Sequence, residues 1–252
     1  HTALGKRRTS ISNEMLQQVE ISTEAFIEKE PITVILSQKE WIKAIKGHQK
    51  DVSDTKLKEG DAVSVVLEAK TTDYIILMSD SGRFYSLLGD SLPRGNTAGE
   101  PLRLMIDLAP DDRIISAFVF EKGIKFLLTS SSGKGCIVDS SNLLSSTKAG
   151  KQVFNVGKDE RAYSCQHVRG DMVAIMGENR KLLLFPLEEI PEITRGQGVI
   201  LQRYKDAGLS DILTFNLADG LSWSLGTRTR VETNLTTWIG KRGSAGKFPP
   251  VG

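Results

Sequence analysis

Four short stretches of the sequence combine glycine with Lys or Arg, a combination suited to binding phosphate. They read RGNTAGEPL (94–102), KAGKQV (148–153), EITRGQGVIL (192–201) and KRGSAGKF (241–248). Glycine lets a backbone come close to a partner, and a neighbouring cation supplies charge for a phosphate group. The glycines Gly99, Gly150, Gly198 and Gly246 lie 51, 48 and 48 residues apart. The chain therefore repeats a potential phosphate contact at a nearly constant interval.

A second landmark, a short apolar run that ends in a tight turn, precedes each loop. IILMSDSGRFYSLL (75–88) aligns with FLLTSSSGKGCIVD (126–139), which places Gly82 on Gly133. VAIMGENRKLLLFP (173–186) fits the same frame with Arg180 at the glycine position, and LSWSLGTRTRVE (221–232) fits more loosely. TVILSQKEWIKAI (33–45) supplies an earlier copy, for which Gly60 in LKEGD is the expected loop glycine. These matches predict five copies of one unit.

Each unit has the pattern of short strands joined by turns. Apolar, β-branched runs are broken by Asp-Ser-Gly or Gly-Glu-Asn, as hairpins require. A period of this length predicts a propeller-like array of four-stranded blades that bury their faces against one another; an irregular β-sandwich is the alternative. Helical periodicity is confined to the start, where Ser12 is expected to cap a helix. We therefore divide the chain into a linker or helical segment (1–30) and a β domain (31–252).

The sequence also resembles a known family. EPITVILSQKEWIKAIKGH (30–48), followed by LKEGD and SDSGRFYSL, is similar to the start of the C-terminal domain of the A subunit of bacterial topoisomerase IV. KAGK and LLFPLEEIPEITRGQG continue the resemblance, and GKRRTSI (5–11) is similar to the segment that joins the breakage-reunion core to that domain. The resemblance implies an all-β fold, a β-pinwheel of about five four-stranded blades that exchange strands with their neighbours.

The related gyrase domain differs from this chain at one motif. Its first blade carries Q-R-R-G-G-K-G, which supports full DNA wrapping. Here the corresponding stretches read KGHQKD and KLKEGD, and the nearest approach to the motif is GKRGSAGK (240–247) in the last blade. The resemblance therefore favours topoisomerase IV over gyrase.

The function that this resemblance implies is non-catalytic. The domain would bind and bend duplex DNA and so position the transported segment for ATP-dependent strand passage, decatenation and supercoil relaxation. The implied partners are double-stranded DNA, the breakage-reunion core of the same polypeptide and the ATPase B subunit in an A2B2 assembly, in the cytoplasm at the nucleoid. No cofactor is expected in this chain, because ATP and Mg belong to other domains of the parent enzyme. The alternatives are a gyrase A DNA-wrapping domain, a propeller-type protein-interaction scaffold and a propeller hydrolase.

Basic charge is distributed unevenly along the chain. The formal net charge is only +2, but residues 31–50 sum to +3, residues 221–252 to +4 and residues 51–220 to −4. If the two ends meet in space, they form one basic patch. The predicted DNA-contacting residues are Lys43, Lys46 and Lys50 in the first blade, Arg94, Lys148, Lys151 and Arg195 on the middle loops, and Arg228, Arg230, Lys241, Arg242 and Lys247 in the last blade.

The sequence lacks the residues that a phosphate loop, a metal site or a hydrolase motif would need. SSSGKGC (130–136) has Leu128 where a phosphate loop needs its first glycine and Gly135 where it needs Ser or Thr, so a hairpin turn is expected there. His1, His48 and His167 show no metal-ligand spacing, and neither GxSxG nor HExxH occurs. The sequence therefore predicts no catalytic residue and no metal site.

Composition limits the class of protein to which the chain can belong. A content of 39% hydrophobic and 25% charged residues is typical of a globular protein, and no apolar run approaches the ~18 residues of a membrane span. Cys136 and Cys165 have no CxxC partner and are expected to be free and buried. An aromatic content of 6% disfavours a platform for single strands. The three tryptophans are expected to pack in the core or between blades rather than to contact a ligand. The start, without methionine or a signal-peptide pattern, predicts a piece of a longer protein.

Overall fold

The computed structural model describes residues 26–225 and 227–249, and these form β-strands and short 3-10 turns with no α-helix. Three four-stranded antiparallel sheets come first. In spatial order they are β3 (Val63–Lys70), β1 (Pro31–Ser37), β2 (Trp41–Lys46) and β6 (Glu100–Pro101); β7 (Ile114–Val119), β4 (Tyr74–Ser79), β5 (Arg83–Leu88) and β10 (Lys151–Gln152); and β11 (Ala162–His167), β8 (Lys125–Ser130), β9 (Lys134–Asp139) and β14 (Val199–Ile200).

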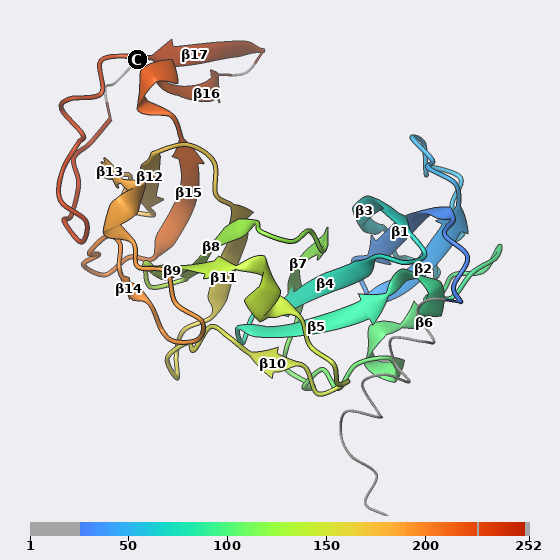
Figure 1. Ribbon diagram of the computed structural model, residues 1–252. Coiled ribbons are helices and arrows are strands. Elements are labelled where there is room, and N and C mark those ends of the chain that lie inside the picture. The colour runs from blue at the N-terminus through green and yellow to red at the C-terminus, as the bar shows by residue number, and fades with distance from the viewer. Residues whose placement is uncertain (1–25, 226, 250–252) are drawn as a thin grey trace, which may run out of the picture.

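The last two sheets have fewer strands. The fourth contains β15 (Leu209–Phe215), β12 (Met172–Gly177) and β13 (Leu182–Pro186), and Lys247 completes its edge through an isolated bridge to Leu182. The fifth is the hairpin of β16 (Leu221–Leu225) and β17 (Arg228–Glu232). Five units in chain order are confirmed, whereas within residues 26–225 and 227–249 only the first three have four strands (Figure 1).

The hairpin turns follow the predicted register. Gly82 and Gly133 have φ angles of +80° and +83°, and Arg180, which aligns with them, has φ +63°. In the first sheet Glu40 takes this position with φ +62°. A left-handed residue before the second strand lets each two-strand unit reverse tightly, and glycine adopts it at least cost. The turn between Ser130 and Lys134 is accordingly a hairpin and not a phosphate loop.

Each of the first four sheets takes its outer strand from a later part of the chain. β6 follows the hairpin of the second sheet in sequence but pairs with β2 of the first. β10 and β14 make the same exchange one and two units later, and Lys247 makes it in the fourth sheet. The strand exchange that the family resemblance implied is therefore present. We call these outer strands, together with the loops that lead into them, the outer rim.

The four repeated glycines have a role other than the predicted one. A Cβ atom on Gly99, where φ is +84°, would lie 2.3 Å from the carbonyl oxygen of Ile42 in β2. Gly150, Gly198 and Gly246 crowd the equivalent carbonyl of the next three hairpins in the same way. The close approach that glycine allows is thus to the chain's own neighbouring sheet, because the exchanged strand must enter there. Gly60 lies between β2 and β3 and is not a copy of these glycines, so that assignment was wrong.

The core lies between the sheets rather than within one of them. Ile75 and Leu77 of β4 pack toward the first sheet, and Ile76 and Met78 pack toward the third. Because successive strand residues face opposite sides, the central hairpins carry continuous apolar runs. Burying each such side chain contributes about 1.5–3 kcal/mol. Adjacent sheets therefore depend on one another for stability.

Ion pairs join the first sheets at the same places in the repeat. Arg113, just before β7, lies 2.9 Å from the carboxylate of Glu40 in the first hairpin turn. Arg161, just before β11, lies 3.7 Å from Asp80 and 3.6 Å from Asp112. Each arginine thus pairs with an acid of the hairpin turn in the preceding sheet.

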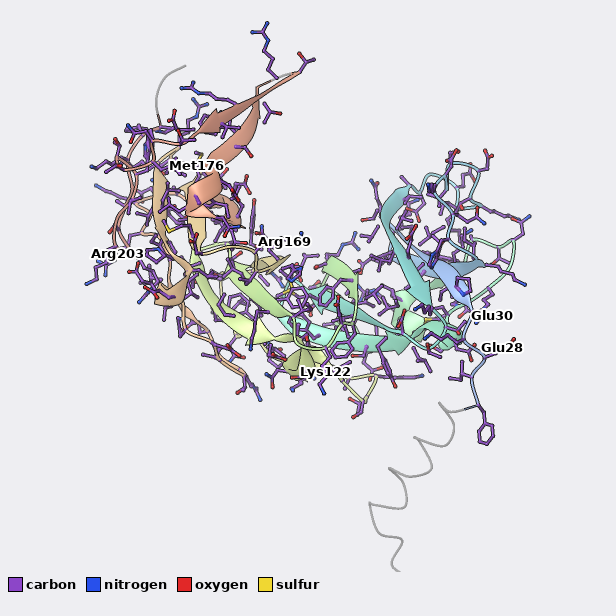
Figure 2. All side chains as sticks on the ribbon, turned by 45° about the horizontal axis from the view of Figure 1, so that its top comes forward. Glu28, Glu30, Lys122, Arg169, Met176 and Arg203 are labelled. Atoms are coloured by element: carbon purple, nitrogen blue, oxygen red, sulfur yellow. The ribbon has the colours of Figure 1, made fainter. Side chains whose placement is uncertain are left out.

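The five sheets form an open arc. The first and fifth sheets lie at its two ends with a wide opening between them in both views (Figures 1 and 2). The two basic ends of the sequence therefore do not meet, and the single basic patch conditional on their meeting is not formed. The helix expected to begin at Ser12 lies outside the described residues. β1 begins at Pro31, and the division of the chain after residue 30 stays a prediction.

Candidate nucleic-acid interface

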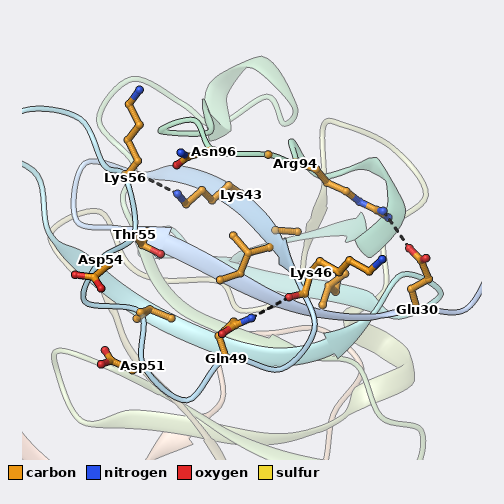
Figure 3. Close-up of a pocket in the computed structure, with 15 residues that line it drawn as sticks. Glu30, Lys43, Lys46, Gln49, Asp51, Asp54, Thr55, Lys56, Arg94 and Asn96 are labelled. Atoms are coloured by element: carbon orange, nitrogen blue, oxygen red, sulfur yellow. Dashed lines mark hydrogen bonds and ion pairs between the residues drawn. The ribbon is translucent and has the colours of Figure 1, made fainter.

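Lys43 does not face solvent as a DNA contact would require. Its side chain is 2% exposed, and its ammonium donates to the carbonyl oxygens of Lys56 at 2.7 Å and Thr97 at 2.9 Å. Burial, and then the neighbouring charge of Lys56, lower the pKa of Lys43. Figure 3 shows the bond to Lys56, and with the bond to Thr97 it ties two loops of the first sheet together. This burial argues against the predicted DNA contact of Lys43, which stays a prediction.

The rest of the first-sheet site is mixed in charge. A groove of about 550 Å³ is lined by the cations Lys46, Lys56 and Arg94 but also by Glu30, Asp51 and Asp54 (Figure 3). Arg94 lies 2.9 Å from Asp90 and 3.5 Å from Glu30, which neutralise it. Lys50 is exposed just before Asp51. This part of the rim offers little net positive charge.

The second sheet carries a basic outer edge. Lys148 and Lys151 are exposed on either side of Gly150, and neither forms an ion pair within the described part of the chain. Arg83, which sequence reasoning missed, donates from Nε to the carbonyl oxygen of Ala149. Its position as the first residue of β5, beside the exchanged strand, could have indicated it.

Arg195 links this edge to the next sheet. It is exposed, and the adjacent Gly196 donates to the carbonyl oxygen of Val153 at 3.0 Å and accepts from the main chain of Asn155 at 2.9 Å. The loop that carries Arg195 therefore lies against the chain that follows Lys151. Arg195 continues the basic outer rim toward the fourth sheet.

A further group of cations lies at the fourth sheet. Arg242 donates to the carbonyl oxygen of Ile200 at 2.7 Å, and the main chain of Arg203 donates to the carbonyl oxygen of Ser244 at 3.2 Å. The amide of Gln202, fully buried, donates at 3.0 Å to the carbonyls of both Lys181 and Ala245. These bonds gather five residues that we call the sheet-four basic cluster: Lys181, Arg203, Lys241, Arg242 and Lys247.

Two members of this cluster escaped prediction from the sequence. Lys181 and Arg203 are far in sequence from the loop 241–247, and only the strand exchange brings them to it. Arg203 lies on the outer side of the arc in Figure 2, whereas Arg169 lies on the side of the opening. The side chain of Arg242 is shielded in part, and Glu189 accepts a hydrogen bond from its main chain at 3.3 Å.

The fifth sheet contributes less than expected. Arg230 lies 3.7 Å from Glu232 and 5.5 Å from the ring of Trp223, so it is partly neutralised and stacked. Arg228 is exposed on the same strand. Of the twelve predicted residues, the structure thus brings Lys148, Lys151, Arg195, Lys241, Arg242 and Lys247 onto the outer rim of the second, third and fourth sheets.

The loop glycine recurs in all of the first four sheets, whereas a cation directly after it does not. Lys151 and Lys247 occupy one register, because each follows the loop glycine and pairs with the second strand of a hairpin. Glu100 and Val199 take this position in the first and third sheets. At this one register, basic residues therefore occupy alternate sheets.

The described residues contain no group of three or more His, Cys, Asp or Glu residues placed to hold a metal ion. Cys136 is buried, which raises its pKa to about 12, and Cys165 is half-buried with a pKa also raised by burial. Both are free thiols. Trp238 is buried between the last two sheets, as expected. In this part of the chain no helix is long and apolar enough to span a bilayer.

Known proteins resemble the whole chain. It is 46% identical over 252 residues to the A subunit of DNA topoisomerase 4 from Rickettsia bellii, covering all of this chain and 34% of that protein. It is 44% identical over 230 residues to the corresponding protein of Caulobacter vibrioides, covering 91% of this chain and 30% of the relative. The family model of the DNA gyrase C-terminal domain, beta-propeller, matches residues 73–121 and 171–213.

The chain belongs to the family of C-terminal β-pinwheel domains found in the A subunit of topoisomerase IV. It spans about a third of the length of the curated relatives.

Solved structures agree with this family at the level of the fold. The E. coli ParC C-terminal domain matches with a TM-score of 0.79 at 23% identity, over 87% of this chain and 94% of that one. A DNA gyrase A C-terminal domain matches with a TM-score of 0.58 at 21% identity, over 86% of this chain and 76% of the other. The topoisomerase IV pinwheel is thus the better geometric match of these two.

Proposed function

We propose that this domain binds duplex DNA along its outer rim and bends it, without a catalytic site of its own. The supporting observation is the set of rim cations that lack a carboxylate partner among the described residues. They are Lys148, Lys151, Arg195, Arg203, Lys241, Arg242 and Lys247. Side chains of this type, on loops and without a recognition helix, contact phosphates rather than base edges.

The curved rim gives this binding a mechanical consequence. Contacts at the second, third and fourth sheets lie on the convex side of the arc, so a duplex that touches all three must bend. Bending 20–30 base pairs by 40–90° costs on the order of 1–6 kcal/mol, which several phosphate contacts together can supply. In the parent protein the bent duplex would be the transported segment of an ATP-dependent strand passage.

The proposed partners follow from the family. They are the breakage-reunion core of the same polypeptide and the ATPase B subunit, in a cytoplasmic A2B2 enzyme whose ATP and Mg lie on other domains. A gyrase-like wrapping role is less well supported, because the first sheet lacks the basic glycine motif and Arg94 there is neutralised by Glu30 and Asp90.

A salt titration of duplex binding tests the proposal. If each of the seven cations neutralises one phosphate, log affinity falls with log salt at a slope of about −6, from roughly −0.9 per phosphate. Lys151→Ala and Lys247→Ala should each make the slope shallower by about 0.9. Arg94→Ala is the matched control and should leave the slope unchanged, because its carboxylate partners already neutralise it.

Two results would contradict this function. One is an affinity independent of salt, and the other is a strong preference for one DNA sequence over a shuffled duplex at equal salt. The same protein should neither nick nor relax plasmid DNA with any added metal or nucleotide. A cleavage activity that disappears with substitution of one of its own residues would show that the domain is catalytic.

A further inference from the structure

Exposed apolar side chains accompany the sheet-four basic cluster. Ile200 is 39% exposed, Ile239 is 42% exposed and Phe248 is 66% exposed. All three belong to the segments that build the cluster: Arg242 binds the carbonyl of Ile200, Ile239 forms a bridge to Leu184 of β13, and Phe248 follows Lys247. Burying a phenylalanine ring is favourable by about 1.5–3 kcal/mol, so a ligand that covered this ring would gain binding energy from it.

The backbone holds Phe248 firmly although its ring is in solvent. Lys247 and Leu182 exchange two main-chain hydrogen bonds, of 2.8 and 2.9 Å. The indole nitrogen of buried Trp238 donates to the carbonyl oxygen of Phe248 at 3.0 Å. The ammonium of Lys181 lies 5.6 Å from the centre of the Phe248 ring. The ring therefore projects from an anchored edge in a region that attracts phosphate.

A duplex lying on this cluster would meet the ring. Apolar side chains that proteins bring against the minor groove can enter between base pairs and unstack one step, which kinks the duplex by about 20–90°. Cations beside such a side chain neutralise the phosphates on both sides of the kink. A protein partner is a weaker fit, because the cores of protein interfaces are depleted in charged residues, and in Lys in particular.

We propose that Phe248 is a wedge that enters the base stack of bound duplex DNA, so that the bend is concentrated as a kink at the fourth sheet. This inference rests on the proposed duplex binding and adds the contact that localises the bend. Phosphate contacts at the second sheet and at Arg195 would then guide the DNA on one side of the kink only.

Variants of Phe248 test the wedge through readouts that phosphate contacts do not share. The probe is a 30-base-pair duplex with dyes at its two ends and 2-aminopurine in a single central TA step, a step that unstacks easily. Wild-type protein should shorten the end-to-end distance and raise the 2-aminopurine fluorescence. Phe248→Ala should abolish the fluorescence rise and weaken binding by about tenfold, while the salt slope stays that of the wild type.

Controls separate the ring from the charge and from the fold. Phe248→Leu keeps an apolar wedge and should retain most of the fluorescence rise. Phe26→Ala removes another exposed ring, 88% exposed and ahead of β1, and should change nothing. Lys247→Ala should make the salt slope shallower by about 0.9 but preserve unstacking. Circular dichroism confirms folding, and Phe248→Gln replaces Phe248→Ala if the alanine variant is unfolded.

The outcomes distinguish the two proposals. If Phe248→Ala and Phe248→Gln bend and unstack the duplex as the wild type does, the wedge is refuted and the rim binding stands. A set of duplexes that carry the TA step at different positions extends the test. If the wild-type protein binds them with the expected salt slope but raises the 2-aminopurine fluorescence of none, the wedge is also refuted. If the wild type shows no salt-dependent duplex binding, both proposals fail.

Discussion

At the register of Lys43 the next three sheets place Tyr85, Cys136 and Leu183, all of which are buried. Lys43 therefore occupies a core position, and its charge has carbonyl oxygens but no carboxylate as partners among the described residues. Burying a charge is costly unless hydrogen bonds compensate for the lost water. Lysine at this place serves to hold the loops of Lys56 and Thr97 together.

Lys43→Met should therefore leave duplex affinity within about twofold of the wild type, because a residue that phosphate does not reach adds no counterion release. Stability provides the second readout. Since folding lowers the pKa of Lys43, the unfolded chain binds more protons as pH approaches the ordinary value of 10.5. The free energy of unfolding of the wild type should therefore rise relative to that of Lys43→Met as the pH approaches 10.5. Urea unfolding of both proteins at pH 7 and near pH 10 measures this, and a constant difference would contradict it.

At the scale of the strand, the glycine before each exchanged segment is the decisive residue. Gly99→Ala should be strongly destabilising, because its Cβ would lie 2.3 Å from a backbone oxygen that cannot move away. Gly123→Ala is the matched control: its φ is +78° against +84° for Gly99, and nothing lies within 4 Å of its Cβ position.

Both substitutions carry the cost of a left-handed alanine, about 1 kcal/mol, and Gly99→Ala should cost about 1–3 kcal/mol more for the clash. Denaturant unfolding of the two variants gives the difference directly. Equal destabilisation would mean that the outer strand of the first sheet shifts without cost, and that the glycine interval reflects turn geometry alone.

At the scale of the whole molecule, the open arc keeps apart charges that a net charge for the chain adds together. Lys46→Ala/Lys50→Ala and Lys148→Ala/Lys151→Ala both remove two positive charges. Neither pair forms an ion pair within the described residues, but the first lies near Asp51, Asp54 and Glu30, whereas the second lies on the basic outer edge of the second sheet. The second pair should make the salt slope shallower by roughly 1.8, and the first should change it much less.

Duplex titrations of both double variants decide whether position or total charge controls binding. Equal losses would show that the field of the entire chain attracts DNA, whatever the local geometry. A larger loss for Lys46→Ala/Lys50→Ala would return the interface to the first sheet, where sequence reasoning placed part of it.

Features that depend on repeated local geometry were predictable from the amino-acid sequence. A tight hairpin needs a left-handed residue at one place, so the alignment of Gly82, Gly133 and Arg180 predicted turns that the structure has. Successive residues of a central strand are buried against the two neighbouring sheets in turn, which requires continuous apolar runs. These runs predicted the strands and the number of units. The family resemblance added the strand exchange, which no local pattern encodes.

Whether each cation can bind a phosphate, by contrast, depends on contacts between residues far apart in the sequence. Arg94 is neutralised by Glu30 across 64 residues, and Arg203 joins Lys241 because an exchanged segment lies against it. Lys43 looks like any other strand lysine in the sequence, yet its register places it in the core. Sheet stacking also leaves the arc open, so the two basic ends stay apart. Charge is a property of one residue, but its pairing and burial depend on contacts between residues far apart in the chain, and these exist only after folding.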